Sequence, residues 1–262
     1  MQRIDEFNGL DPRCAAARIA ATTAPPLLKS IPQTHRLAMR PLPILYFSDI
    51  LCIWAYFSEL RLDQARHDFG AQIQVQYRFF QVFGDVPGKM ATSWRDKGGY
   101  DGFADHVQTI AARFPETPIH PRLWRDSPPA SSNPAHVFLK AVQICEQEQS
   151  CAPGAFERAI RKVRDAFFVE GRNVARREVL LDIGASLDAP VDPICRLIDD
   201  GRAHAALAAD DREAAKLGVK GSPTMSLNEG RQTLSGNIGY RIVEANIQEL
   251  LREPNLDLAS WC

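Results

Sequence analysis

The residue of this sequence best suited to nucleophilic chemistry is Cys52. It follows an apolar run, Pro43 to Phe47, that is typical of a buried strand, and it precedes a predicted helix over residues 53–69. A thiol at a helix N-terminus lies close to free backbone N–H groups and to the positive end of the helix dipole, which both favour the thiolate. We therefore expect a lowered pKa for Cys52 and a thiolate that attacks disulfides, sulfenic acids or electrophilic carbons. A buried, inert cysteine is the alternative.

Ala55 stands where the second cysteine of a Cys-x-x-Cys motif would stand. A second thiol releases the substrate from the mixed disulfide, and alanine cannot do this. Three alternatives stay open. Glutathione resolves the mixed disulfide, or Cys52 binds and activates glutathione for transfer or isomerisation, or a cysteine from the middle of the chain resolves it, with the candidates Cys145, Cys151 and Cys195.

The elements that must position Cys52 follow a recognisable order. The alternating pattern of residues 73–79 predicts a second strand, and the short links make a right-handed βαβ unit. Residues 85–200 have helical periodicity without a convincing strand. We expect helices over about 100–113, 134–149, 154–170, 175–186 and 192–199, then a helix over 202–217, two short strands ending near 235 and a helix over 240–251. This order, βαβ, helical insert, αββα, predicts an α/β thioredoxin fold with a large all-helical insertion.

The expected domains follow from these elements. Residues 41–84 and 202–252 would form the thioredoxin-like domain, and residues 85–201 the helical insertion domain. Residues 1–40 have little periodicity and are expected to be a disordered leader, with Met39 as the hypothetical natural start. Ser48 or Asp49 is expected to cap the helix over 53–69, and Asn173 to cap the helix over 175–186.

Composition narrows the class of protein. The 262 residues carry a formal net charge of −1, which does not favour a nucleic-acid partner, and no apolar run is long enough to span a membrane. The six cysteines are too few for a disulfide scaffold, so a cytoplasmic location is expected. Their spacing does not match a metal site, so no metal is expected. Cys145 and Cys151 are close in sequence and are interpreted as two independent reduced thiols, with a disulfide as the alternative.

Two motifs far apart in the chain carry a resemblance to the DsbA family of thioredoxin-fold proteins. Residues 48–56 resemble its active-site turn, Asp-x-x-Cys-x-Trp-Cys-Tyr, and residues 218–224 resemble its loop Gly-Val-x-Gly-x-Pro-Thr. The helical insert lies between them, and residues 170–173 with 179–180 resemble a segment near its end. Over residues 42–251 the chain is similar to the cytosolic branch that holds FrnE-like oxidoreductases, 2-hydroxychromene-2-carboxylate isomerases and kappa-class glutathione transferases.

The resemblance implies roles for particular residues. It places a cis Ser222–Pro223 bond opposite Cys52, so that Ser222 and Pro223 present backbone to the substrate. Trp54 is expected mainly to pack in the core and at most to shape the surroundings of the thiol, and Asn133 is a weaker candidate for contact with a glutathione-like ligand. In the isomerase and transferase branches serine commonly occupies the position of Cys52, so the cysteine favours redox chemistry here.

The function implied is a DsbA-like thiol-disulfide oxidoreductase that acts through a single catalytic cysteine. Its substrate would be a thiol or disulfide, with glutathione as co-substrate and no tightly bound cofactor. The alternatives are a kappa-type glutathione transferase or isomerase, and a redox-inactive binding or chaperone-like module. The resemblance is also compatible with a homodimer. The sequence names neither the physiological substrate nor the electron donor.

Overall fold

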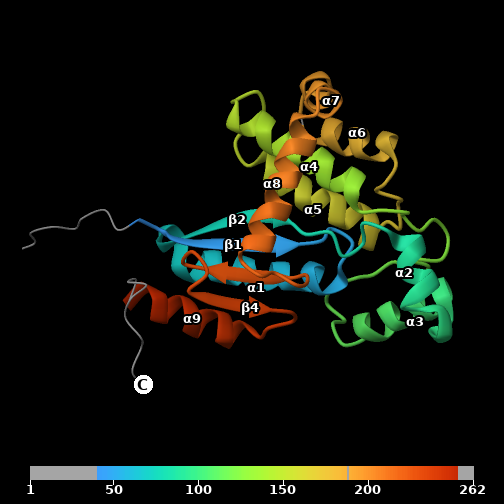
Figure 1. Cartoon of the computed structure of the whole chain (residues 1–262), viewed down its shortest axis with the longest axis horizontal. Coiled ribbons are helices and arrows are strands. Elements are labelled where there is room, and N and C mark those ends of the chain that lie inside the picture. Colours follow the sequence, from blue (N-terminus) through green and yellow to red (C-terminus); the bar gives the residue numbers. More distant parts are fainter. Residues whose placement is uncertain (1–39, 188, 253–262) are drawn as a thin grey trace, which may run out of the picture. The chain divides into compact units, whose positions relative to one another are not determined.

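One mixed sheet carries the site. The computed structural model describes residues 40–187 and 189–252, so the predicted leader and the Met39 start lie outside the described residues. The sheet has the strand order β2-β1-β3-β4 (Figure 1). β2 runs parallel to β1, and β3 and β4 each run antiparallel to the strand before them in that spatial order. The strands are β1 (Leu42–Ser48), β2 (Ile73–Phe79), β3 (Thr224–Leu227) and β4 (Gln232–Ser235).

The predicted order of elements is confirmed, and every predicted helix appears within a few residues of its expected bounds. One short helix was missed, α2, whose seven residues are too few to show a periodicity; Asp85 caps it by accepting the N–H of Gly88. The α-helices are α1 (Ile53–Phe69), α2 (Val86–Thr92), α3 (Gly99–Ala111), α4 (Asn133–Gln147), α5 (Ala155–Phe168), α6 (Arg177–Ser186), α7 (Val191–Asp199), α8 (Arg202–Lys216) and α9 (Tyr240–Arg252).

The sheet is covered on both sides, which explains why its inner strands are so apolar. Figure 1 shows α1 and α9 on one side and α8 with α4 to α7 on the other, while α2 and α3 lie beyond the end of the strands. Ile44, Tyr46 and Phe47 of β1 are each at most 1% exposed. A strand buried on both faces needs a continuous apolar run, which is the pattern that predicted β1 from the sequence. The division into two domains, 41–84 with 202–252 and 85–201, stays a prediction.

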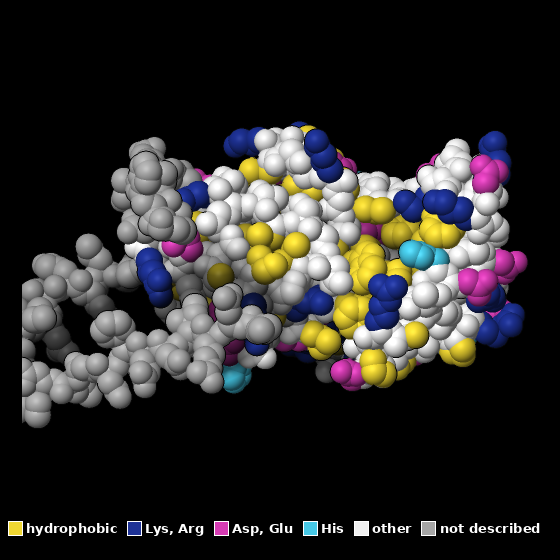
Figure 2. All heavy atoms as spheres, turned by 90° about the horizontal axis from the view of Figure 1, so that it is seen from below, with side chains coloured by type: hydrophobic (Ala, Val, Ile, Leu, Met, Phe, Trp, Pro, Cys, Tyr) yellow, Lys and Arg dark blue, Asp and Glu magenta, His cyan; other side chains and the backbone are white. Residues whose placement is uncertain are grey.

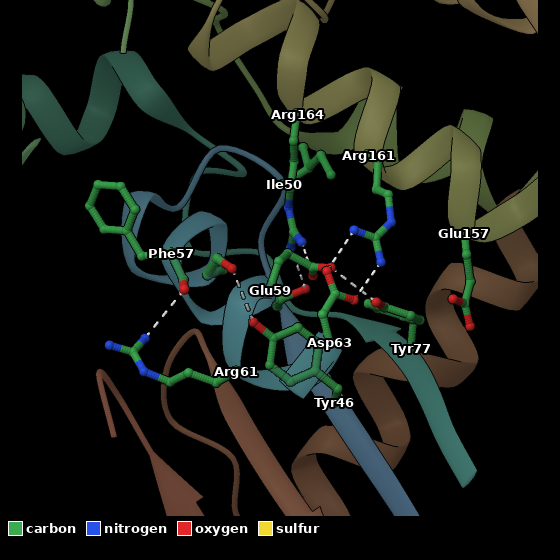
Figure 3. A network of polar contacts seen from close by, with 12 residues as sticks. Tyr46, Ile50, Phe57, Glu59, Arg61, Asp63, Tyr77, Glu157, Arg161 and Arg164 are labelled. Atoms are coloured by element: carbon green, nitrogen blue, oxygen red, sulfur yellow. Dashed lines mark hydrogen bonds and ion pairs between the residues drawn. The ribbon is translucent and has the colours of Figure 1, made fainter. Parts of the chain in front are cut away.

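A buried ion pair fastens the insertion to the strand that leads into the site. Arg164 of α5, only 1% exposed, pairs with Glu59 of α1 and donates to Ser48 Oγ at 3.1 Å. Tyr77 of β2 donates to the other oxygen of Glu59 at 3.1 Å. Figure 3 shows Arg164 from α5 and Tyr77 from β2 on either side of Glu59 from α1. Because a buried guanidinium needs its partners, this network holds α5 in place beside the end of β1.

A second buried ion pair joins α4 to α8 and to the end of β2. Lys140 of α4 lies 2.6 Å from a carboxylate oxygen of Asp210 in α8, and the same carboxylate accepts the backbone N–H of Phe79 at 2.8 Å. Lys140 and Asp210 are each only 3% exposed. The carboxyl end of β2 is therefore fastened to α4, the helix that approaches the site from the insertion.

The predicted cap of α6 is wrong. α6 begins at Arg177, later than expected, and Asn173 is not its cap. The Asn173 side chain instead accepts the N–H of Ala175 at 2.9 Å, so it closes the turn that precedes the helix. Within the two described ranges, none of the helices is long and apolar enough to cross a membrane.

Candidate functional site

Cys52 lies at the junction of β1 and α1. A turn of three residues separates it from the strand, and its N–H donates to the carbonyl of Asp49 at 3.1 Å. Its own carbonyl accepts the N–H of Tyr56 at 3.0 Å, so Cys52 is the N-cap residue of α1. The sulfur is therefore placed at the first turn of the helix, as the sequence predicted. The residue is only 6% exposed.

A loop from the other end of the chain faces the thiol. Cys52 Sγ donates to the carbonyl oxygen of Ser222 at 3.3 Å, and the Ser222–Pro223 peptide bond is cis. The Ser222 hydroxyl accepts the N–H of Asp49 at 2.8 Å, so Ser222 contacts both ends of the turn that carries the cysteine. The structure thus brings together Cys52, Ser222 and Pro223, three of the five residues selected from the sequence. Their roles toward a substrate stay predictions.

The predicted lowering of the Cys52 pKa is wrong. Burial raises the pKa of this thiol above its ordinary value, because a thiolate at this position would lose most of its hydration. The Ser222 side chain and the backbone N–H groups of Ala55 and Trp54 pull the pKa down, while the charge of Asp49 adds to the rise. The donors of the helix start are present, as expected from the sequence, but burial outweighs them.

Asp49 holds the active-site turn together from inside. Its buried carboxylate accepts three hydrogen bonds, from the N–H of Leu51 at 2.9 Å, the N–H of Phe83 at 2.8 Å and the hydroxyl of Ser132 at 2.9 Å. The sequence suggested Ser48 or Asp49 as the cap of α1, and this is wrong, since no side chain caps that helix. Asp49 instead joins the turn to the segment after β2 and to the start of α4.

His136 supports the same turn from α4. Its Nε2 accepts the N–H of Ile50 at 3.0 Å, and its ring stacks on Phe79 with the ring centroids 4.8 Å apart. Burial lowers the pKa of His136 to about 4, which the charge of Asp49 only partly opposes, so the imidazole is neutral near pH 7. A neutral imidazole engaged with the backbone is not the cationic partner of a cysteine–histidine dyad. Sequence periodicity placed His136 on a helix but had no signal for this contact.

The remaining two candidates lie differently. Trp54 packs edge-on against Phe57 and Phe114, with centroid distances of 6.4 and 6.3 Å, as expected for a core aromatic. Asn133 is the first residue of α4 and borders a cavity of about 470 Å³ that Cys52 and Ser222 do not line. Its Oδ1 is buried and has no hydrogen-bond partner among the described residues. Contact of Asn133 with a ligand of Cys52 stays a prediction.

The other described thiols lie away from Cys52. Cys145 is nine residues beyond His136 on α4, about 13 Å further along that helix at 1.5 Å per residue. Cys145 and Cys151 are both free thiols, as expected, and Cys145 contributes to the raised pKa of Cys151. Cys195 of α7 is partly exposed. None of the three contacts Cys52, and Cys14 and Cys262 lie outside the described residues.

The described part of the chain offers no evident metal site. Within residues 40–187 and 189–252, no three histidine, cysteine, aspartate or glutamate side chains come together in a way that could hold a metal ion. The groups available for chemistry around the turn are therefore the Cys52 thiol, the Ser222 hydroxyl and backbone, and the donors at the start of α1.

The βαβ unit, the αββα unit and the cysteine facing a cis-proline loop define a thioredoxin-fold protein with a helical insertion. The model of the DSBA-like thioredoxin domain matches residues 43–248. The chain belongs to this family, which confirms the resemblance and the fold class expected from the sequence. Among curated proteins, it is 23% identical over 237 residues to the ClpXP adapter protein SpxH of Halalkalibacterium halodurans, covering 84% of this chain and 72% of that protein.

Solved structures share the fold at low sequence identity. A protein of Streptomyces coelicolor described as a probable DsbA oxidoreductase matches with a TM-score of 0.65 and 20% identity, over 84% of this chain and 94% of its own. The cytosolic disulfide reductase DsbM of Pseudomonas aeruginosa matches with a TM-score of 0.60 and 23% identity, over 80% and 99% of the two chains. A 2-hydroxychromene-2-carboxylate isomerase matches with a TM-score of 0.56 and 17% identity, over 83% and 100%.

Proposed function

We propose that the protein is a thiol-disulfide oxidoreductase that works through Cys52 alone and uses glutathione as its co-substrate. The observation that carries the proposal is the pairing of the Cys52 sulfur with the Ser222 carbonyl, 3.3 Å away, next to a first helical turn in which Ala55 stands where a second cysteine would be. A thiol held against backbone, with no thiol partner of its own, needs a resolving thiol from solution. The solved structure of DsbM with glutathione supports such a partner. DsbM is described as cytosolic, which supports a location in the cytoplasm for this protein as well.

The proposed cycle has two exchanges. The Cys52 thiolate attacks the glutathione sulfur of a mixed disulfide between glutathione and a substrate thiol; that bond breaks, and the substrate thiolate leaves and takes up a proton. Glutathione then attacks the glutathione sulfur bound to Cys52 and releases the Cys52 thiolate with glutathione disulfide. One disulfide is consumed and one is formed, so no other oxidant or reductant is needed.

Ser222 and Pro223 have a positioning role in this proposal. The Ser222 carbonyl that accepts the Cys52 S–H stabilises the resting thiol, and burial raises its pKa. A substrate strand that lies along the loop would take over the Ser222 backbone. The Ser222 hydroxyl and the N–H groups of the first helical turn would then stabilise the sulfur anion as it forms or leaves.

The test is the reduction of a glutathionylated peptide by glutathione, followed through the release of glutathione disulfide. The full chain should accelerate the reaction, and Cys52→Ser should reduce the rate to the uncatalysed background. Cys195→Ser serves as the matched control, since Cys195 is partly exposed but away from the turn, and it should keep the wild-type rate. Activity retained in Cys52→Ser would overturn the proposal.

A glutathione transferase or isomerase is the second candidate, and it rests on the isomerase among the structures that share the fold. The two chemistries differ at the sulfur of Cys52. A redox cycle forms a disulfide between Cys52 and glutathione, whereas a transferase keeps glutathione non-covalent and joins it to an electrophile. A bound glutathione without a mixed disulfide, together with conjugation of 1-chloro-2,4-dinitrobenzene, would favour the transferase.

A binding module without redox chemistry is the third candidate, and the similarity to an adapter protein supports it. The low exposure and the raised pKa of Cys52 also fit a thiol that does not react. Under this alternative Cys52→Ser would keep every function of the protein, so the same variant separates an enzyme from a binding module.

A homodimer stays part of the proposal. Figure 2, which views the molecule from below Figure 1, shows apolar side chains exposed among charged ones. Among the described residues, the large exposed apolar side chains are Leu60 at 55%, Ile242 at 52% and Val169 at 37%. Size-exclusion chromatography with light scattering measures the mass of the protein in solution directly. A mass of 29.2 kDa, that of one chain, would show a monomer and contradict the homodimer.

A further inference from the structure

Two thiols outside the proposed catalytic site meet where α4 ends. Gln149 has a φ of +58°, the left-handed conformation that reverses the chain after a helix. The N–H groups of Ser150 and Cys151 both donate to the carbonyl of Cys145, at 2.8 and 3.2 Å. The chain therefore folds back over the last turn of α4, and this brings Cys151 next to Cys145.

The two cysteines are neighbours through the backbone, since the Cys151 N–H donates to the Cys145 carbonyl. Both cysteines are free, and Cys151 is 8% exposed while Cys145 is fully buried. Burial, followed by the hydrogen bond to Cys145, raises the pKa of the Cys151 thiol to about 12, and the charge of Glu146 adds to the rise. The Glu146 carboxylate accepts the N–H groups of Gly154 and Phe156, each at 2.7 Å, so the segment that follows Cys151 is fixed to the end of α4.

We propose that Cys145 and Cys151 form a second redox site, a dithiol that a low-molecular-weight disulfide such as glutathione disulfide converts to an intrachain disulfide. The Cys151 thiolate attacks glutathione disulfide and forms a mixed disulfide, releasing one glutathione thiolate. Cys145 loses its proton and attacks the Cys151 sulfur, releasing the second glutathione. Two protein thiols and one glutathione disulfide become one protein disulfide and two glutathione molecules, so atoms and electrons balance.

The positions of the two thiols decide the product. Cys151 is the one with access to solvent, so it meets the oxidant first. Because a backbone hydrogen bond of 3.2 Å holds Cys145 beside Cys151, the mixed disulfide is resolved within the chain and no lasting glutathione adduct accumulates. The raised pKa makes the first attack slow at neutral pH and faster as the pH rises. The pair lies at the opposite end of α4 from His136 and the Cys52 turn, so oxidation of the pair leaves Cys52 free.

The experiment uses the full chain carrying Cys52→Ser, which removes competing adducts at Cys52. The protein is incubated with glutathione disulfide at pH 8.5, alkylated, digested without reduction and mapped by mass spectrometry. The expected product is a disulfide joining the peptides of Cys145 and Cys151, with a loss of two hydrogen atoms from the intact mass. Closing this short ring should raise the midpoint of thermal unfolding by about 5 °C, and dithiothreitol should reverse the shift.

The matched control adds Cys151→Ser to the same chain and should show neither the disulfide nor the thermal shift. A persistent glutathione adduct at Cys151, a disulfide that involves Cys195, or two thiols still free after prolonged incubation would each overturn the proposal. The mapping of the unaltered pair decides the question even if the control variant fails to fold. None of these outcomes depends on the function proposed for Cys52.

Discussion

Helix α4 has a thiol site near each end, and the two sites differ in what stands opposite the sulfur. Beside its first residues, Cys52 faces the Ser222 carbonyl, and Ala55 occupies the place of a second thiol. At its last turn, Cys145 lies next to Cys151, whose N–H donates to the Cys145 carbonyl. Burial raises a thiol pKa at both ends, so burial does not distinguish them. The two sites are distinguished by the group next to the sulfur. A carbonyl leaves the sulfur free to react with an external disulfide, whereas a neighbouring thiol forms a disulfide within the chain.

The largest effect is expected from Asp49→Ala at the Cys52 end. The substitution leaves three buried donors without their acceptor, which should lower the free energy of unfolding by about 3–5 kcal/mol. It should also alter the reactivity of Cys52 while leaving Cys151 unchanged, since Asp49 contacts only the first site. Urea unfolding and site-resolved alkylation measure the two effects. Equal changes at both thiols would show that the ends of α4 are not separate.

A somewhat smaller effect comes from His136 and depends on pH. Its pKa is near 6.5 in the unfolded chain and about 4 in the folded one, so between these values the unfolded state binds more protons and stability falls as the pH falls. The loss from pH 7 to pH 4 should be about 3 kcal/mol. His136→Gln keeps an acceptor for Ile50 and should remove this part of the slope. Identical pH profiles of urea unfolding for the two proteins would contradict the assignment.

Ala55→Cys should convert the Cys52 site into a dithiol site like that of Cys145 and Cys151. A thiol one helical turn from Cys52 would compete with added glutathione for the mixed disulfide, since a neighbouring group has a high effective concentration. Release of glutathione from a preformed Cys52 adduct, without added thiol, should accelerate by about a hundredfold or more. Stopped-flow or quenched mass analysis follows the release, with Ala55→Ser as control. An unchanged rate would mean that position 55 does not reach the sulfur.

The smallest effect on stability is expected from Glu146→Ala, at the end of α4 that carries Cys145. Glu146→Ala removes the acceptor of two backbone N–H groups and should cost about 1–2 kcal/mol of stability. It should slow formation of the Cys145–Cys151 disulfide, because the returning segment is no longer fixed, and should leave the reactivity of Cys52 as it was. Thermal unfolding and the disulfide map test both. A slower Cys52 in this variant would show coupling along α4.

Part of this picture was available from the sequence. The apolar run of β1 and the alternation of β2 are local patterns. The two motifs placed Cys52 and Ser222 face to face although these residues are 170 positions apart. Periodicity also located α3 to α9, but α2 is too short for it. These are properties that neighbouring residues determine, or that a family resemblance supplies.

The rest depends on tertiary packing. Asp49 was expected at a helix end, yet its partners come from Phe83 and Ser132, which no local pattern connects to it. The pKa of Cys52 was given the wrong direction because the helix start is visible in sequence and the burial is not. The contact of Cys145 with Cys151 likewise depends on the left-handed Gln149, a conformation that glutamine rarely signals.

The central claim, that Cys52 works without a second protein thiol, is tested most directly by a chain in which Cys52 is the only cysteine. Glutathione disulfide should place one glutathione on Cys52 in this variant, fresh glutathione should remove it, and the rate of peptide deglutathionylation should match that of the wild type. A glutathione adduct that persists, or turnover that returns only when Cys145, Cys151 or Cys195 is restored, would contradict the account.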